Sequence, residues 1–139
     1  MNENEIGAII VDEAVHLHQA LGPGLLEVVY EAVLADILQK RGLVVERQRA
    51  IPIVYEGHKF DEGFRADLIV QGKVIIELKS VEKLHPVHKK QVLTYLKLTG
   101  LKLGYLLNFR EAIMKTGIVR ILNGTLNDNS FVSPCLCEK

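Results

Sequence analysis

Two carboxylates and a lysine fall on neighbouring predicted strands of this chain. In the stretch KVIIELKS, residues 73–80, side chains alternate between the two faces of a strand, so Glu77 and Lys79 share one face. The preceding predicted strand ends in FRADLIV, residues 64–70, which places Asp67 on the same face as Arg65 and Ile69. Ala66, Leu68 and Val70 face the other way. Such a cluster could hold a hard cation such as Mg²⁺, with the lysine orienting or deprotonating an attacking water. The ordinary alternative is an amphipathic strand with an exposed ion pair.

Whether the two carboxylates cluster depends on the register of the hairpin between these strands. A three-residue loop of residues 70–72, with Gly72 left-handed, would pair Arg65 with Glu77 and leave Asp67 diagonally adjacent on the same face. A two-residue loop would place the carboxylates on opposite faces. The sequence leaves both registers open.

The N-terminal part of the chain predicts two helices. Helical spacing of apolar residues over residues 4–20 indicates the first, with Asn4 as its N-cap, and LGPG then breaks it. The second runs from about residue 25 to 41, before Gly42 as the left-handed cap. Its predicted apolar stripe is Leu26, Val29, Val33, Ile37 and Leu38.

A period of two from residue 43 onward predicts strands. The stretches 43–55, 58–70 and 73–80 form an antiparallel meander, and Pro52 indicates an edge position or a bulge. A helix then begins at Pro86 and ends before Gly100, and strands follow at 103–109 and 117–123. The order predicts a mixed α/β (α+β) class with one domain, residues 1–122, and a poorly ordered polar tail, residues 123–139.

Composition limits the function classes. The chain has 139 residues, 48% hydrophobic and 24% charged, with a formal net charge of zero, so no global basic field indicates a nucleic-acid partner. No apolar run is long enough for a membrane span, and the acidic start MNENEIG does not suit a secretory signal. Cys135 and Cys137 lack nearby partner ligands and are expected to be reduced and idle. A cytoplasmic protein is expected.

Three motifs and the element order then carry a resemblance. Asp67, nine residues, and Glu77-Leu78-Lys79 form a D…(D/E)xK pattern, GLLEVVY (residues 24–30) matches G-x-x-E-x-x-Y, and QVLTY (residues 91–95) matches Q-x-x-x-Y. Over roughly residues 5–122 the chain resembles the GxxExxY family of the PD-(D/E)xK nuclease superfamily, in its RecB-like exonuclease branch. The resemblance implies a restriction-endonuclease-like core, a mixed central sheet containing the meander, flanked by helices. Ala66 stands where the superfamily pattern has proline.

The resemblance also implies roles for individual residues. It implies Mg²⁺ or Mn²⁺ as cofactor, with Asp67, Glu77, the Leu78 carbonyl and Glu27 as ligands. Lys79 would activate or position the water, and Gln91 and Tyr95 would position the substrate or the lysine. Gly24, Glu27 and Tyr30 are the residues that match the family motif.

Lysines gather after the proposed site. Only Glu82 opposes them, and His85 and His88 add charge when protonated. They form either a solvated helix face or a local phosphate-binding stripe, in which Lys83, Lys89 and Lys90 would contact nucleic acid. The full set is Lys79, Lys83, Lys89, Lys90, Lys97 and Lys102.

The leading hypothesis is therefore a Mg²⁺-dependent nuclease acting on DNA or RNA, with no membrane partner. The alternative is a catalytically inactive nucleic-acid- or protein-binding module that keeps the nuclease fold. A Cys- or His-based hydrolase is disfavoured, because no Ser or Cys lies in a nucleophile context. An exposed edge near Pro52, or the tail, could serve a homodimer.

Overall fold

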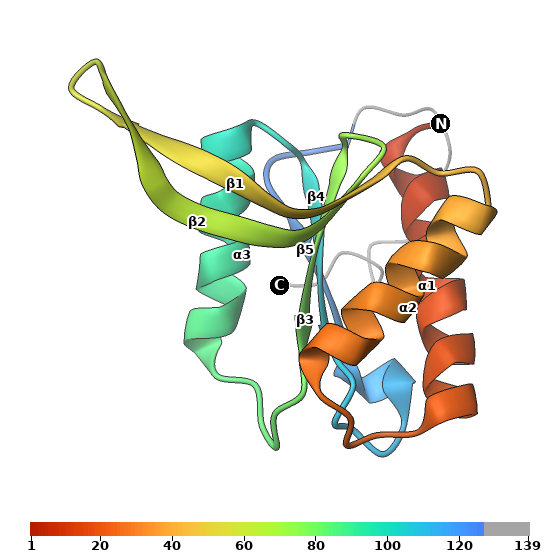
Figure 1. Ribbon diagram of the computed structural model, residues 1–139. Coiled ribbons are helices and arrows are strands. Elements are labelled where there is room, and N and C mark those ends of the chain that lie inside the picture. The colour runs from red at the N-terminus through yellow and green to blue at the C-terminus, as the bar shows by residue number, and fades with distance from the viewer. Residues whose placement is uncertain (127–139) are drawn as a thin grey trace.

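A five-stranded sheet lies between two helical layers in the computed structural model, which describes residues 1–126 (Figure 1). Helices α1 and α2 cover one face and α3 covers the other, each over its own apolar core. The elements are α1 (Glu3–Leu21), α2 (Glu27–Lys40), β1 (Val45–Tyr55), β2 (His58–Val70), β3 (Val74–Lys79), α3 (Pro86–Thr99), β4 (Leu103–Asn108), the 3₁₀ helix η1 (Met114–Gly117) and β5 (Ile118–Leu122). The predicted class, a mixed α/β fold with a mixed central sheet flanked by helices, is confirmed.

The sheet runs β1-β2-β3-β4-β5, with β1 to β3 as the predicted antiparallel meander. Helix α3 is the crossover that lets β4 pair parallel to β3. Strand β1 lies at the edge, and its pairing with β2 is irregular between Ile51 and Ile53, around Pro52. Both readings of that proline, edge and bulge, are therefore confirmed.

Strand β3 is buried on both faces, because it is the central strand and helices cover both sides. Ile75 is fully buried on one face, Ile76 on the other, and Glu77 is only 9% exposed. The interpretation of this strand as amphipathic, with one face in water, is therefore wrong.

The helix ends differ in one respect from the prediction. The N-cap of α1 is Asn2, not Asn4: Asn2 Oδ1 accepts the Glu5 N–H at 2.8 Å, and Glu5 Oε1 accepts the Asn2 N–H at 2.9 Å. This reciprocal capping box requires Asn and Glu three residues apart, which only Asn2 provides at this end. Helix α3 begins at Pro86 and stops at left-handed Gly100, as predicted.

The buried face of α2 was mispredicted. Of the predicted stripe only Leu38 is fully buried, while Leu26 is 73% exposed. Tyr30 fixes the rotation of the helix instead, since its ring stacks on Phe109 of the core at 4.3 Å. The buried residues are consequently Tyr30, Glu31, Leu34, Ala35 and Leu38.

The far half of the β1–β2 hairpin extends beyond both helical layers (Figure 1). It forms an arm whose exposed apolar side chains are Ile53, Val54, Tyr55 and Phe60. None of the helices among residues 1–126 is long and apolar enough to cross a bilayer.

The chain after β5 stays attached to the body over its first residues. The Asn123 N–H donates to the Lys102 carbonyl at 2.9 Å, and Leu126 packs against the core on the α1–α2 side. The rest of the predicted polar tail, including Cys135 and Cys137, lies outside the described residues.

Candidate active site

The turn between β2 and β3 sets the register that decides whether the carboxylates meet. Val70 pairs with Val74, so residues 71–73 form the loop. Both Gln71 (φ 56°) and Gly72 (φ 61°) are left-handed, where the prediction had assigned that conformation to Gly72 alone. The predicted pairing of Arg65 with Glu77 is therefore wrong by two residues.

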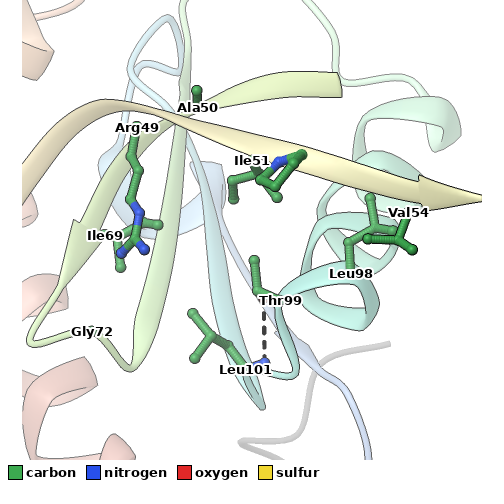
Figure 2. A pocket seen from close by; sticks show the side chains of 10 residues that line it. Arg49, Ala50, Ile51, Val54, Ile69, Gly72, Leu98, Thr99 and Leu101 are labelled. Atoms are coloured by element: carbon green, nitrogen blue, oxygen red, sulfur yellow. Dashed lines mark hydrogen bonds between the residues drawn. The ribbon is translucent and has the colours of Figure 1, made fainter. Parts of the chain in front are cut away.

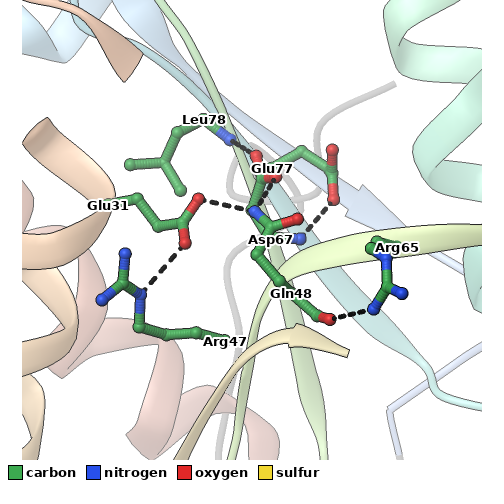
Figure 3. A network of polar contacts seen from close by, with 7 residues as sticks. All are labelled: Glu31, Arg47, Gln48, Arg65, Asp67, Glu77 and Leu78. Carbon is green, nitrogen blue, oxygen red and sulfur yellow. Dashed lines mark hydrogen bonds and ion pairs between the residues drawn. The ribbon is translucent and has the colours of Figure 1, made fainter. Parts of the chain in front are cut away.

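The pair after Leu68–Ile76 in this register would be Asp67 and Glu77, so these two residues lie opposite each other and their carboxylates cluster. The backbone pairing of β2 with β3 ends at Leu68 and Ile76, and hydrogen bonds between backbone and side chains follow it. The Asp67 N–H donates to Glu77 Oε2 at 2.9 Å, and the Leu78 N–H donates to Asp67 Oδ2 at 2.9 Å (Figure 3). Each carboxylate is thus held by the backbone of the neighbouring strand.

The alternation of faces along β2 is interrupted at Asp67. Ala66 and Ile69 both pack in the core on the α3 side, whereas Leu68 packs in the core on the α1–α2 side. The prediction that Ala66 and Leu68 share a face is wrong. The interruption lies across from Gln48 of β1, whose backbone is left-handed (φ 51°).

Burial dominates the electrostatics of Glu77. Burial first, and then the negative charge of Asp67, raise the pKa of this carboxyl to about 8. The Asp67 N–H and the Lys79 ammonium oppose the shift without cancelling it. Two carboxylates this close do not both ionise readily unless a cation compensates their charge.

The pKa of Asp67 is also raised, first by burial and then by the charge of Glu31. The Leu78 N–H, the Gln48 amide and the charge of Lys79 act against this. The two carboxylates therefore offer hard oxygen ligands whose charge a cation would balance. Such ligands fit a hard divalent cation such as Mg²⁺ or Mn²⁺. Among residues 1–126, however, no three His, Cys, Asp or Glu side chains are arranged as a ready metal site.

Glu27, the predicted further ligand, opens α2 beside the end of β3. Its Oε2 accepts the Ser80 N–H at 3.0 Å, and Ser80 Oγ donates to the Leu25 carbonyl at 2.9 Å. These contacts tie the segment after Lys79 to the start of α2. Leu78, the other predicted ligand, contacts Asp67 through its amide nitrogen.

The remaining motif residues, Gly24 and Tyr30, shape the loop that delivers Glu27. Gly24 has φ 97°, a conformation that residues with a side chain rarely adopt. Tyr30 is fully buried, and its hydroxyl donates to the Gly22 carbonyl and accepts the Leu25 N–H at 3.1 Å. In this structure the G-x-x-E-x-x-Y residues thus form one unit, with Gly24 and Tyr30 supporting Glu27.

Tyr30→Phe should lower the free energy of unfolding by about 1–3 kcal/mol, since it leaves the half-buried Gly22 carbonyl and the Leu25 N–H without their side-chain partner. Urea denaturation followed by circular dichroism measures this. The matched control is Tyr55→Phe on the arm, where the ring is 65% exposed and no loss is expected. Equal stability of the two variants would contradict a supporting role for the Tyr30 hydroxyl.

Helix α3 brings Tyr95 to the site. Its ring stacks on Phe64 of β2, with centroids 3.4 Å apart and 11° between planes. Burial raises the pKa of Tyr95, and the charges of Glu77 and Asp67 raise it further, so its hydroxyl lies within their field. Gln91 lies one turn earlier on the same helix and is exposed.

The predicted cationic residues lie around the segment that joins β3 to α3. Lys83 is in this segment, and Lys89 and Lys90 are in the first turns of α3. Partial burial lowers the pKa of His88, and the Lys79 charge lowers it further while Glu27 acts against it. The charges of Lys79 and Glu27 therefore both act on His88.

Sequence reasoning missed Glu31, which is the buried carboxylate of α2. Glu31 is 5% exposed, and it accepts hydrogen bonds from Arg47 Nε at 3.1 Å and Gln48 Nε2 at 2.8 Å. Its spacing of four from Glu27 was the available signal, since residues at i and i+4 share a helix face.

A second missed residue is Asn108, at the end of β4. It is fully buried, and its side-chain amide makes two hydrogen bonds to the backbone of Val81, at 3.1 and 2.9 Å. It fixes the segment that follows Lys79.

The hollow in Figure 2 is separate from this site. It lies between β1 and the C-terminal end of α3, and its residues include Ile51, Val54, Leu98 and Leu101. Its single charged side chain is Arg49, and neither of the clustered carboxylates lines it.

Comparison with known proteins identifies one family. The sequence model of the PD-(D/E)XK nuclease superfamily matches residues 4–121. No curated protein and no solved structure matches the chain. The matched range covers all the helices and strands described above except the first residue of α1 and the last residue of β5.

Proposed function

Since the chain belongs to the PD-(D/E)XK nuclease superfamily, we propose that it is a metal-dependent nuclease that hydrolyses phosphodiester bonds of DNA or RNA. The observation that carries the proposal is the Asp67–Glu77 pair. Glu77 is buried and Asp67 is half-buried, each carboxylate is hydrogen-bonded to the backbone of the opposite strand, and the charge of Lys79 acts on both. Burial opposes the ionisation of such a pair, so the pair costs stability in the metal-free protein. Carboxyl groups with pKa values perturbed in this way cluster at functional sites.

The proposed metal ligands are Asp67 and Glu77, with the Leu78 carbonyl and Glu27 completing the set. The proposed ion is Mg²⁺, with Mn²⁺ as a substitute. When bound, such an ion supplies a Lewis acid and lowers the pKa of a coordinated water. The lone pairs that Asp67 and Glu77 use neither toward the backbone nor toward Gln48 remain available for it.

Lys79 is the proposed catalytic residue. Lys79 is the last residue of β3, two residues after Glu77 and on the same face. The charge of its ammonium group lowers the pKa values of both carboxyl groups. In this position it would orient or deprotonate the attacking water and stabilise negative charge on the phosphate oxygens.

Helix α3 supplies the proposed substrate contacts. Tyr95 and Gln91 would position the substrate or Lys79, supported by the charge of both carboxylates acting on Tyr95. Lys83, Lys89 and Lys90 would bind the phosphate backbone, as sequence-independent contacts do.

Within the superfamily we assign the chain to the GxxExxY family and the RecB-like exonuclease branch, on the motif residues Gly24, Glu27 and Tyr30 with Gln91 and Tyr95. A single nuclease domain over residues 1–122, a cytoplasmic location and a homodimer also stay predictions. Of these, the domain boundary is supported by the match over residues 4–121.

A cleavage assay tests the proposal. Labelled linear duplex DNA, single-stranded DNA and RNA are incubated with the protein and Mg²⁺, Mn²⁺ or EDTA. Cleavage is expected with either ion and none with EDTA, because without the ion the site has no Lewis acid to activate the attacking water. Restoration of cutting when excess Mg²⁺ follows EDTA is the control, and the product ladder separates exonuclease from endonuclease action.

Silence on every substrate, from folded protein with either ion, would contradict the nuclease assignment. It would favour a binding module that keeps the fold. Cutting that persists in EDTA would contradict the metal dependence.

A further inference from the structure

Gln48 of β1 has an unusual backbone and an unusual side-chain environment. Its φ of 51° lies in the left-handed region, which residues other than glycine, asparagine and aspartate rarely adopt. It lies across from Asp67, between the paired positions Arg47–Leu68 and Arg49–Ala66, without pairing itself. The strand is therefore distorted at the point nearest the carboxylates.

The side chain of Gln48 joins two carboxylates. Its Nε2 donates to Glu31 Oε1 at 2.8 Å and to Asp67 Oδ1 at 3.1 Å (Figure 3). Glu31 is a firm anchor, since it is buried and its other oxygen accepts Arg47 Nε. Arg65 Nη1 donates to the Gln48 carbonyl at 3.1 Å and holds the distorted backbone from the other side.

Asp67 is consequently held at both oxygens, at Oδ2 by the Leu78 N–H and at Oδ1 by Gln48. Two-point contact fixes both the plane and the direction of a carboxylate. Backbone strain that is held by its surroundings in this way gathers at functional sites.

We infer that Gln48 is a positioning residue, which transmits the fixed orientation of Glu31 to Asp67 and so sets the metal affinity of the site. This inference rests on the proposed function. Partners of ligating carboxylates typically change metal affinity by about 10–100-fold when removed.

The test is a Mn²⁺ titration of the metal-free full chain by isothermal calorimetry. Gln48→Gly removes the amide and accommodates the left-handed backbone, and it is expected to weaken Mn²⁺ binding about 10–100-fold. The matched control is Gln71→Gly, because Gln71 is also a glutamine with positive φ (56°) but lies in the β2–β3 turn. That control should leave Mn²⁺ affinity unchanged.

A second measurement separates positioning from a structural role. Cleavage rates measured against Mn²⁺ concentration should show a raised half-saturating concentration in Gln48→Gly, with the rate at saturation returning toward wild type. Circular dichroism establishes that each variant is folded. If Gln48→Gly does not fold, Gln48→Asn carries the same expectation, since asparagine accepts positive φ and has a shorter side chain.

Wild-type Mn²⁺ affinity in a folded variant would overturn the role of Gln48 and leave the nuclease proposal intact. Mn²⁺ binding that is weakened in Gln48→Gly, from a wild type that cuts no substrate, would support Gln48 and overturn the nuclease. A wild type that binds no Mn²⁺ would overturn both.

Discussion

Lys79→Ala is expected to reduce cleavage by about 10²–10⁴-fold, the usual contribution of a positioned proton-transfer group. The variant should keep its fold, because Lys79 contributes to the sheet through its backbone, which alanine retains. The Lys79 carbonyl accepts the Phe109 N–H at 2.9 Å. Initial rates on the best substrate of the cleavage assay, at saturating Mg²⁺, measure the loss.

The matched control for this variant is Lys97→Ala, an exposed lysine of α3 in the same cationic set. It should keep most of the activity, with a weakened dependence on salt, since phosphate contacts act through counterion release. Retained cutting in Lys79→Ala would end the catalytic assignment of this lysine. Equal cutting by wild type and both variants would indicate a contaminating nuclease.

Glu77→Gln is expected to abolish cleavage and to stabilise the metal-free protein at pH 8. Burial raises the pKa of Glu77 in the folded state to about 8, from an ordinary value of 4.5. The folded state therefore favours the protonated carboxyl of Glu77. Its contribution to the free energy of unfolding is complete below about pH 4.5 and is lost as the pH rises through 8. At about 1.4 kcal/mol per pKa unit, the loss is a few kcal/mol.

Urea unfolding in EDTA at pH 5 and pH 8 measures this effect. Glutamine keeps an oxygen for the Asp67 N–H but does not ionise, so the variant should lose much less stability than wild type over this range. The matched control is Glu62→Gln on the exposed arm, which should follow wild type. A wild-type stability that does not fall between pH 5 and 8 would contradict the buried, protonated Glu77.

Most of the fold could be predicted from the sequence because its signals are local. Pro86 and Gly100 bound α3, the apolar period separates helices from strands, and Pro52 marks the irregular edge. The errors occur where several local solutions compete. Asn2 and Asn4 both suit an N-cap, and both glycine and glutamine in the β2–β3 turn are left-handed, which shifts the register by two residues.

The site was harder to predict because it depends on contacts between distant segments. The D…(D/E)xK pattern indicates Asp67 and Glu77, which the structure brings together. Nothing near Glu31 in the sequence indicates that its partners are Arg47 and Gln48, 16 and 17 residues later. Likewise, the burial of Glu77 follows from the central place of β3, which only the complete sheet order reveals.

The backbone hydrogen bonds to the carboxylates of Asp67 and Glu77 also determine when these side chains lose their rotational freedom. Each carboxylate is already fixed by a backbone N–H of the opposite strand. Ordering a side chain of this kind costs up to about 2 kcal/mol of conformational entropy, and here that cost arises during folding. An ion that binds later meets ligands that are already ordered, so little of its binding free energy is spent on reorganisation.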